Sequence, residues 1–255
     1  MEELYTTWKA IGVAGGDLSF FQDFFVKFYQ AFIEGDRWLQ YLNGVKTTLL
    51  VTALALILGI VLGVLVAMLR TAHDQQRPGH RNPILAVLNL ICKVYVTVIR
   101  GTPMMVQLLI MGFVIFASSR NFTMIGTLTL GINSGAYVSE IVRGGLMSVD
   151  KGQMEAGRSL GMSYVSTMKD IILPQAMKSA LPALINEMIT LLKETSICGY
   201  IGLNELTRGG DIIRGITFDA LFPLFTVALI YLVMVLFIQW IMGKVERRLR
   251  SSDYR

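Results

Sequence analysis

Long runs without a charged residue constrain this chain more than any other feature of its sequence. Four such runs lie at residues 47–69, 102–119, 121–139 and 220–243. About 20 apolar residues in a helix cross the roughly 30 Å hydrocarbon core of a bilayer. The four runs approach that length, and they therefore predict an all-α membrane protein.

The composition agrees with lipid as the main solvent. Charged residues make up 16% of the 255 residues, whereas soluble domains carry about 25%. A fifth candidate span, residues 179–200, is apolar apart from Glu187, Lys193 and Glu194. We therefore expect about five transmembrane helices.

A further apolar stretch at residues 84–99 contains one charge, Lys93. It begins with Asn82-Pro83, a helix cap followed by proline at the first helical position. At about 16 residues the stretch is short for a crossing. We interpret it as an interfacial helix that leads into the second span, since a sixth span would reverse the orientation of every later segment.

The positions of lysine and arginine predict the orientation, because short cytoplasmic loops are enriched in both residues. With the amino terminus outside, fifteen of the 23 basic residues fall in inner segments, seven in outer segments and Lys193 within the membrane. The bias predicts an outer amino terminus and a cytoplasmic carboxyl terminus with a basic tail, residues 244–255. The same placement beside apolar spans argues against nucleic-acid binding, despite the net charge of +5.

Several kinds of functional site are not expected from this sequence. Cys92 and Cys198 lie in separate apolar segments, so no disulfide is expected. His73 and His80 share a polar loop without a cysteine or paired acid at metal-ligand spacing, so no metal site is expected. No Gly-x-x-x-x-Gly-Lys-Ser/Thr phosphate loop occurs, so ATP hydrolysis is not expected of this chain. Residues 1–17 lack the pattern of a cleavable signal peptide.

Residues 18–33 are rich in aromatic side chains, with Asp23 and Lys27 as their only charges. The two charges are four residues apart, and the aromatic residues cover most of the remaining surface of a helix. This pattern predicts a helix that lies in the outer membrane interface. A helix packed on the bundle with no separate role fits the pattern equally well.

The most informative segment is the inner loop after the third predicted span, where residues 155–174 read EAGRSLGMSYVSTMKDIILP. Residues 152–161 are too polar to cross a membrane. They predict a short helix along the membrane surface, ended by Gly161 in a left-handed conformation. Pro174 and Pro182 then bracket the return into the membrane, because proline limits continuous helix.

This loop resembles the signature of the ATP-binding-cassette (ABC) importer permeases. That signature reads Glu-Ala-Ala, three residues, Gly, nine residues, Ile, one residue, Leu-Pro. The matching residues keep both spacings: Glu155, Ala156, Gly157, Gly161, Ile171, Leu173 and Pro174. Gly157 departs from the usual alanine, which keeps the position small but loosens the helix by about 1 kcal/mol.

Three further segments are similar to the polar amino-acid uptake branch of that family, the histidine, glutamine, arginine and glutamate type. They read RGTPMMVQLL from Arg100, NSGAYVSEIVRGGLMSV from Asn133 and LPALINEMITLLKETSI from Leu181. The resemblance covers residues 44–243 and implies the type I ABC importer permease fold there. It leaves residues 1–43 as an amino-terminal extension and makes residues 150–175 a cytoplasmic coupling loop.

The resemblance also implies partners and a division of labour. The short helix, about residues 152–162, is expected to sit in a groove of an ATP-binding subunit, with Glu155, Ala156, Gly157 and Gly161 at the contact. Glu155 is expected to set the start of this helix. The chain itself is then no enzyme and needs no cofactor, because ATP and Mg belong to the ATPase. A second permease copy or paralogue and an extracytoplasmic substrate-binding protein complete the importer in a bacterial plasma membrane.

Polar side chains inside spans predict where an amino-acid substrate passes, since such groups usually face a cavity or a partner. We hypothesise that Asn133, Ser134, Glu187 and Met188 line the site, with the Glu187 carboxylate facing the substrate ammonium group. The alternative is that these groups hold helices together. Glu140 and Arg143 are expected to pair with each other at the inner end.

Two other classes of function compete with an importer subunit. A stand-alone secondary transporter or channel often contains two related halves with broken helices, and no matching half is found in this sequence. An intramembrane enzyme would need a paired aspartate, a zinc-spaced histidine or a serine–histidine pattern, and none of these occurs.

Overall fold

The computed structural model describes residues 1–76 and 82–250, and the regular structure of these residues is entirely helical. Residues 77–81 of the predicted polar connector and 251–255 of the predicted basic tail lie outside the described residues. The all-α prediction is confirmed for the part of the chain described.

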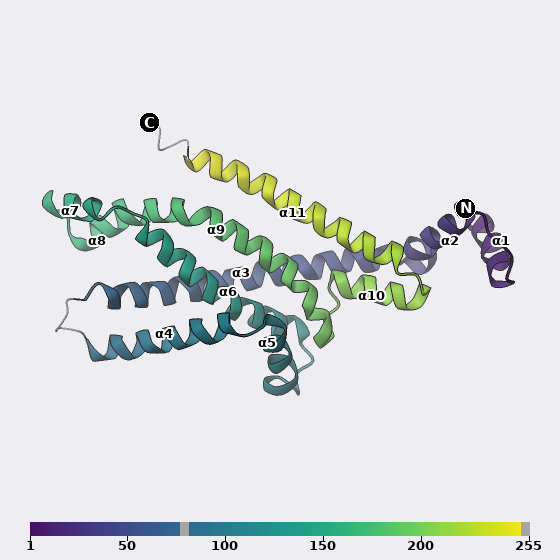
Figure 1. Cartoon of the computed structure of the whole chain (residues 1–255), viewed down its shortest axis with the longest axis horizontal. Helices are drawn as coiled ribbons and strands as arrows, with labels where there is room; N and C mark the ends of the chain where they lie inside the picture. The colour runs from purple at the N-terminus through teal and green to yellow at the C-terminus, as the bar shows by residue number, and fades with distance from the viewer. Residues whose placement is uncertain (77–81, 251–255) are drawn as a thin grey trace.

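Five helices of 19 or more residues run lengthwise through an elongated bundle (Figure 1). They are α3 (Trp38–Asp74), α4 (Pro83–Gly101), α6 (Phe122–Met147), α9 (Leu173–Glu194) and α11 (Leu221–Arg250). The amino terminus lies at one end of the bundle, and α11 runs from that side toward the other end (Figure 1).

Shorter helices connect or extend the five long ones. They are α1 (Glu2–Val13), α2 (Phe20–Phe32), η1 (Glu34–Asp36), α5 (Met104–Ile110), η2 (Met111–Ile115), α7 (Lys151–Ser159), α8 (Tyr164–Thr167), η3 (Met168–Ile172), η4 (Thr195–Ile201) and α10 (Leu206–Thr217). Helices α7 and α8 lie at the end of the bundle farthest from the amino terminus, which we call the foot end (Figure 1).

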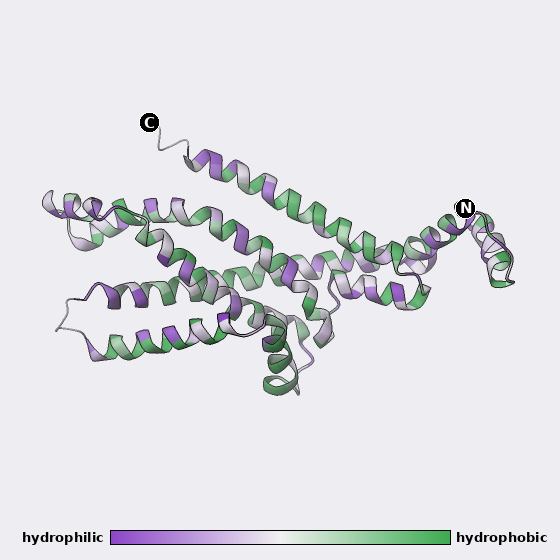
Figure 2. Ribbon diagram, in the orientation of Figure 1, coloured by the Kyte–Doolittle hydropathy of each residue, from purple (hydrophilic) through white to green (hydrophobic). Residues whose placement is uncertain are grey.

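Among the described residues, three helices are long and apolar enough to cross a membrane: Glu34–Asp74, Pro83–Gly101 and Leu221–Arg248. Figure 2 shows hydrophobic residues along most of α3 and α11 and hydrophilic residues gathered around α7. Helix α6 is more polar, and it packs against α3, α4, α5 and α9. A helix surrounded in this way needs less apolar surface, because its neighbours shield it from lipid.

The structure corrects the predicted second span. Residues 102–119 do not form one helix, because the backbone is extended at Thr102 and Pro103 and helix covers only Met104–Ile115. Helix α4, predicted to be interfacial, has the length and hydropathy of a crossing instead. The long helices α3, α4, α6, α9 and α11 run in alternating directions along the bundle (Figure 1).

One of the two charged residues of α4, Arg100, is compensated by side chains of another helix. Arg100, near the end of α4, forms an ion pair with Glu140 of α6. The Arg100 guanidinium also lies 5.0 Å from the centre of the Tyr137 ring. A paired cation is far less costly in an apolar environment than an isolated one, and periodicity along α4 alone could not reveal this partner.

Close packing of α3 against α6 depends on small residues. A Cβ atom added at Gly59 would lie 2.9 Å from the Ser134 Cβ, and one at Gly63 would lie 2.6 Å from the Val138 Cβ. Real Cβ atoms do not approach so closely. Glycines therefore allow these two backbones to meet, as small residues commonly do between helices in membranes.

Candidate functional site

Helix α7, at the foot end, begins with a side-chain cap. The Asp150 carboxylate accepts a hydrogen bond from the Gly152 backbone N–H at 2.6 Å. Aspartate is among the best residues at this position, because it satisfies a backbone donor that the helix leaves free. The expectation that Glu155 sets the start of the helix is therefore wrong: Glu155 lies in the second turn, with its side chain exposed.

The end of α7 follows the predicted left-handed stop. Gly161 has a φ of +82°. The Met162 N–H donates to the Gly157 carbonyl at 3.1 Å, and the Gly161 N–H donates to the Arg158 carbonyl at 3.1 Å. This pair of bonds is the Schellman arrangement, in which a glycine turns the chain away from the helix axis. Both ends of α7 are thus fixed by local bonds.

The four residues predicted to contact an ATPase do not share one face of α7. Glu155, Ala156 and Gly161 are exposed, whereas Gly157 is buried. A Cβ atom at Gly157 would lie 2.5 Å from the Thr167 Cγ2 of α8. Gly157 therefore packs inward against α8. The outward surface of α7 is formed by Ala156 and by Leu160, which is 83% exposed.

This packing predicts the effect of restoring the family alanine. We expect Gly157→Ala to destabilise the packing of α7 on α8. A contact of 2.5 Å belongs in the upper part of the range of about 1–3 kcal/mol for overpacking, which exceeds the roughly 1 kcal/mol that alanine gains over glycine in a helix. Adding Thr167→Ser removes the clashing Cγ2 and should restore the wild-type melting temperature. Thermal unfolding of the single and double variants measures this. A higher melting temperature for Gly157→Ala alone contradicts the prediction.

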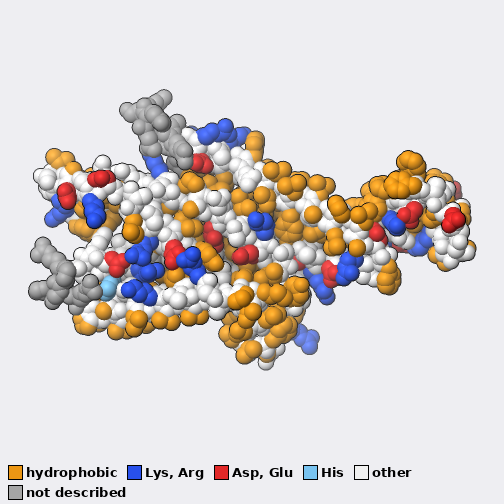
Figure 3. Space-filling view, in the orientation of Figure 1, with side chains coloured by type: hydrophobic (Ala, Val, Ile, Leu, Met, Phe, Trp, Pro, Cys, Tyr) orange, Lys and Arg blue, Asp and Glu red, His pale blue; other side chains and the backbone are white. Residues whose placement is uncertain are grey.

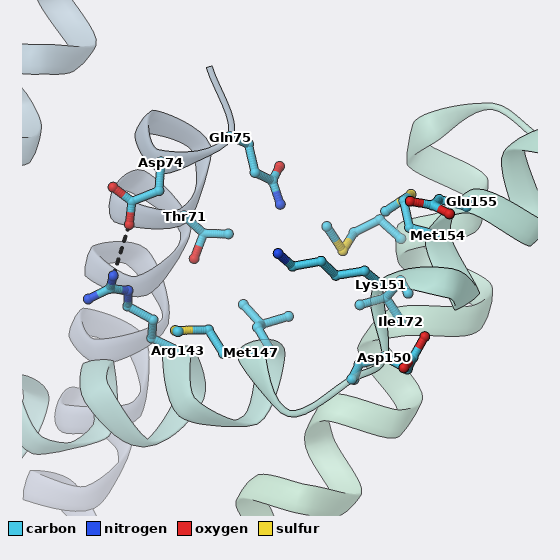
Figure 4. A pocket seen from close by; sticks show the side chains of 13 residues that line it. Thr71, Asp74, Gln75, Arg143, Met147, Asp150, Lys151, Met154, Glu155 and Ile172 are labelled. Carbon is cyan, nitrogen blue, oxygen red and sulfur yellow. Dashed lines mark hydrogen bonds and ion pairs between the residues drawn. The ribbon is translucent and has the colours of Figure 1, made fainter. Parts of the chain in front are cut away.

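A cavity of about 560 Å³ lies behind α7, between α7 and the ends of α3 and α6 (Figure 4). Thirteen residues line it: Thr71, Asp74, Gln75, Arg143, Leu146, Met147, Val149, Asp150, Lys151, Met154, Glu155, Met168 and Ile172. The Lys151 side chain extends into the space (Figure 4). Helix α7 itself packs on α8 and η3, so a displacement of α7 would reach α9 through these two short segments.

An ion pair on the wall of this cavity corrects another expectation. Arg143 Nη2 lies 3.0 Å from Asp74 Oδ2 on α3 (Figure 4). Glu140 pairs with Arg100 on α4 instead. The predicted pair of Glu140 with Arg143 is therefore wrong, because each residue has a partner from another helix that sequence spacing does not reveal.

A second polar cluster lies between the long helices. Ser134 Oγ of α6 donates to Glu187 Oε1 of α9 at 2.8 Å. Ser134 is fully buried, and Glu187 and Met188 are half-buried. The structure thus brings together two of the predicted substrate residues on facing helices.

Asn133 turns toward another partner, which the sequence analysis missed. Its Nδ2 donates to Gln107 Oε1 of α5 at 3.0 Å. The Gln107 Nε2 in turn donates to the Ile99 carbonyl at 2.7 Å, which ties α5 to the end of α4. The sequence did contain a signal for this contact. Gln107 is the one amide side chain in the uncharged run 102–119, and a polar group in such a run usually faces a partner.

Residues 84–251 match the family described as binding-protein-dependent transport system inner membrane component. The chain belongs to this family. Another member is the arginine transport system permease protein of Bacillus subtilis, 40% identical over 185 residues that cover 67% of this chain and 84% of the relative. The glutamine transport system permease protein of Escherichia coli is 39% identical over 171 residues, which cover 64% and 77%.

Solved structures of inner membrane components share the fold. A chain of an amino acid ABC transporter crystallised with histidines is 39% identical, with a TM-score of 0.73 over 82% of this chain and 94% of that chain. A chain of the methionine ABC transporter, 23% identical, has a TM-score of 0.70 and agrees in fold. The fold predicted from the resemblance, that of a type I importer permease, is thus confirmed.

Proposed function

We propose that this inner membrane component is the permease subunit of an ABC importer that moves a polar amino acid across the bacterial plasma membrane. ATP is hydrolysed on a separate subunit, which also holds the Mg. The observation that carries the proposal is α7, a short helix fixed at both ends that turns Ala156 and Leu160 away from the rest of the chain. The relatives that transport arginine and glutamine support an amino acid as substrate.

The proposed orientation places the amino terminus outside and the foot end in the cytoplasm. The basic residues beside the spans support this assignment. An ATP-binding subunit then contacts α7 from the cytoplasm, and an extracytoplasmic binding protein delivers substrate at the opposite end. A second permease copy or paralogue completes the membrane unit.

Reconstitution tests this assignment of function. The purified chain in proteoliposomes is expected to take up no amino acid alone, and to show ATP-dependent uptake once the ATPase and binding protein are added. Uptake by the chain alone, driven by an ion gradient, would instead identify a secondary transporter. Co-purification of a separate ATPase with the chain from its native membrane is the accompanying measurement.

The Ser134–Glu187 pair is the centre of the proposed substrate site, with Asn133 and Met188 beside it. A carboxylate between two helices suits the ammonium group of an amino acid, and hydroxyl and amide groups suit its carboxylate. The competing role is adhesion between α6 and α9, since the 2.8 Å bond already joins them. Charge and hydrogen bonding can be separated here by substitution.

Glu187→Gln removes the negative charge but keeps an oxygen that can accept the Ser134 hydrogen bond. We expect apparent affinity for the amino acid to fall by about tenfold, equivalent to roughly 1.4 kcal/mol, because a charge-assisted contact is lost. Binding of radiolabelled amino acid and uptake by the assembled complex measure this. Ser134→Ala, which keeps the charge, is the matched control. Unchanged apparent affinity across several amino acids in a Glu187→Gln complex would remove Glu187 from the site.

A further inference from the structure

The amino-terminal helices form a hairpin that is fixed to the start of α3. The Tyr5 and Tyr29 rings stack at 4.2 Å, and the Trp8 and Phe25 rings meet edge to face at 5.3 Å. Stacked and edge-on aromatic pairs of this kind add stability beyond their buried area. One face of α2 is therefore occupied by α1.

Glu34 joins the hairpin to the long helix that follows. Its carboxylate accepts a hydrogen bond from Tyr5 Oη at 2.8 Å and pairs with Lys9 Nζ at 2.6 Å and Arg37 Nη1 at 2.9 Å. A carboxylate that binds two donors of α1 and one residue at the start of α3 holds the two segments in one arrangement. The hairpin is thus a defined structure and not a loose extension.

An adjacent face of α2 carries an aromatic stripe that is exposed among the described residues, apart from the contact of Phe24 and Phe28 with Phe222. Its members are Phe20, Phe21, Phe24 and Phe28, exposed by 78%, 81%, 49% and 40%. Three of them are spaced four residues apart, so they line one side of the helix. The Asp23–Lys27 ion pair, with an N–O distance of 2.6 Å, flanks the stripe. A helix with an aromatic face beside a charged pair is suited to a boundary between apolar and aqueous surroundings.

The stripe continues the apolar surface of α11. The Phe24 and Phe28 rings lie 4.9 Å and 6.2 Å from the ring of Phe222, the second residue of α11. Leu221 and Phe225 are more than half exposed, so the start of α11 also presents apolar side chains outward. Figure 3 shows hydrophobic side chains over α11 and again on the lobe at the amino-terminal end.

The sequence of α11 places this contact at the edge of the hydrocarbon. Asp219 is the last charged residue before the uncharged run 220–243, which is long enough to cross a bilayer. Phe222 therefore lies at the membrane boundary, and the α2 residues that touch it lie at the same depth. Aromatic side chains are enriched at that level in membrane proteins.

We propose that the α1–α2 hairpin is a membrane anchor whose Phe20, Phe21, Phe24 and Phe28 side chains insert into the interface of the leaflet beside the start of α11. The occupant is lipid, because the stripe is continuous with the apolar surface of a spanning helix. The proposal needs only the membrane location of the chain and does not depend on its substrate or on coupling to an ATPase.

Fluorescent labelling of the full chain in lipid vesicles tests the anchor. In a Phe21→Cys variant, an environment-sensitive dye is attached to the new cysteine. Residue 21 is 81% exposed, so the substitution should not disturb folding. The matched control is Glu3→Cys on the exposed surface of α1. Cys92 and Cys198 are buried, and wild-type protein labelled in parallel gives the background.

Iodide in the aqueous phase is expected to quench the dye at position 21 several-fold less than the dye at position 3. A spin-labelled lipid should quench the dye at position 21 preferentially. Equal quenching by iodide at both positions overturns the proposal. Protection of position 21 that occurs only after the extracytoplasmic binding protein is added also overturns it, because the stripe would then be a protein docking surface.

Discussion

Gly145→Leu is expected to unfold the junction between α6 and α9 and to abolish assembly of the importer. A Cβ atom at Gly145 would lie 2.6 Å from the Ala176 backbone oxygen and 2.9 Å from the Ala180 Cβ. The first of these neighbours is backbone and cannot rotate away. Overpacking in a tight core typically costs about 1–3 kcal/mol and sometimes more, and a leucine against backbone belongs at the upper end of that range.

The neighbouring glycine provides a matched control. Gly144 is exposed and has no atom within 4 Å of an added Cβ. Gly144→Leu therefore introduces the same side chain one residue away without a clash. With a loss of about 3 kcal/mol, the melting temperature of Gly145→Leu should fall by roughly 6–12 °C, whereas that of Gly144→Leu should stay near wild type. Similar melting curves for the two variants would contradict the observed packing of α6 on α9.

Leu160→Asp is expected to uncouple ATP hydrolysis from transport without unfolding the chain. Leu160 follows α7 directly and is 83% exposed, so its side chain makes few packing contacts within the subunit that the substitution could remove. In the proposed complex an ATPase covers it, and an unpaired carboxylate buried there costs several kcal/mol. A loss of about 3 kcal/mol corresponds to an association on the order of 100-fold weaker.

An exposed apolar residue replaced by aspartate at the other end of the molecule serves as the control. It separates loss of the ATPase contact from a general loss of stability. Val13 is also 83% exposed, at the end of α1. We expect Val13→Asp to retain ATPase binding and ATP-dependent uptake, and Leu160→Asp to lose both while keeping its melting temperature. Co-purification with the ATPase and uptake into proteoliposomes are the measurements. Normal uptake by Leu160→Asp would show that this surface does not receive the ATPase.

Local patterns in the sequence predicted the local structures well. Asn82-Pro83 begins α4, and the Asn82 side chain accepts a hydrogen bond from the Ile84 N–H at 2.9 Å. Gly161 ends α7 in the left-handed region, as glycine permits at low cost. Features of this kind depend on residues within a few positions of one another, so a single sequence contains all the necessary information.

Contacts between distant residues could not be predicted in the same way. Arg100 pairs with Glu140 and Arg143 with Asp74, and both partners come from other helices. The span assignment failed because the run 84–99 was taken as too short to cross, whereas α4 extends to Gly101 and includes Arg100, which is paired with Glu140. The Ser134–Glu187 contact was anticipated only as membership of one polar cluster. Its geometry required the packing of α6 on α9.

The length of α3 has a mechanical consequence. Its 37 residues, at about 1.5 Å each, make a rod of roughly 55 Å, well beyond the roughly 30 Å of hydrocarbon. One end adjoins Arg37, which is bound to Glu34 of η1, and the other ends at Asp74 on the cavity wall. No proline interrupts it. Because a helix barely changes length, a tilt of α3 at one surface of the membrane also moves its other end. The helix can thus act as a rigid lever between the two surfaces.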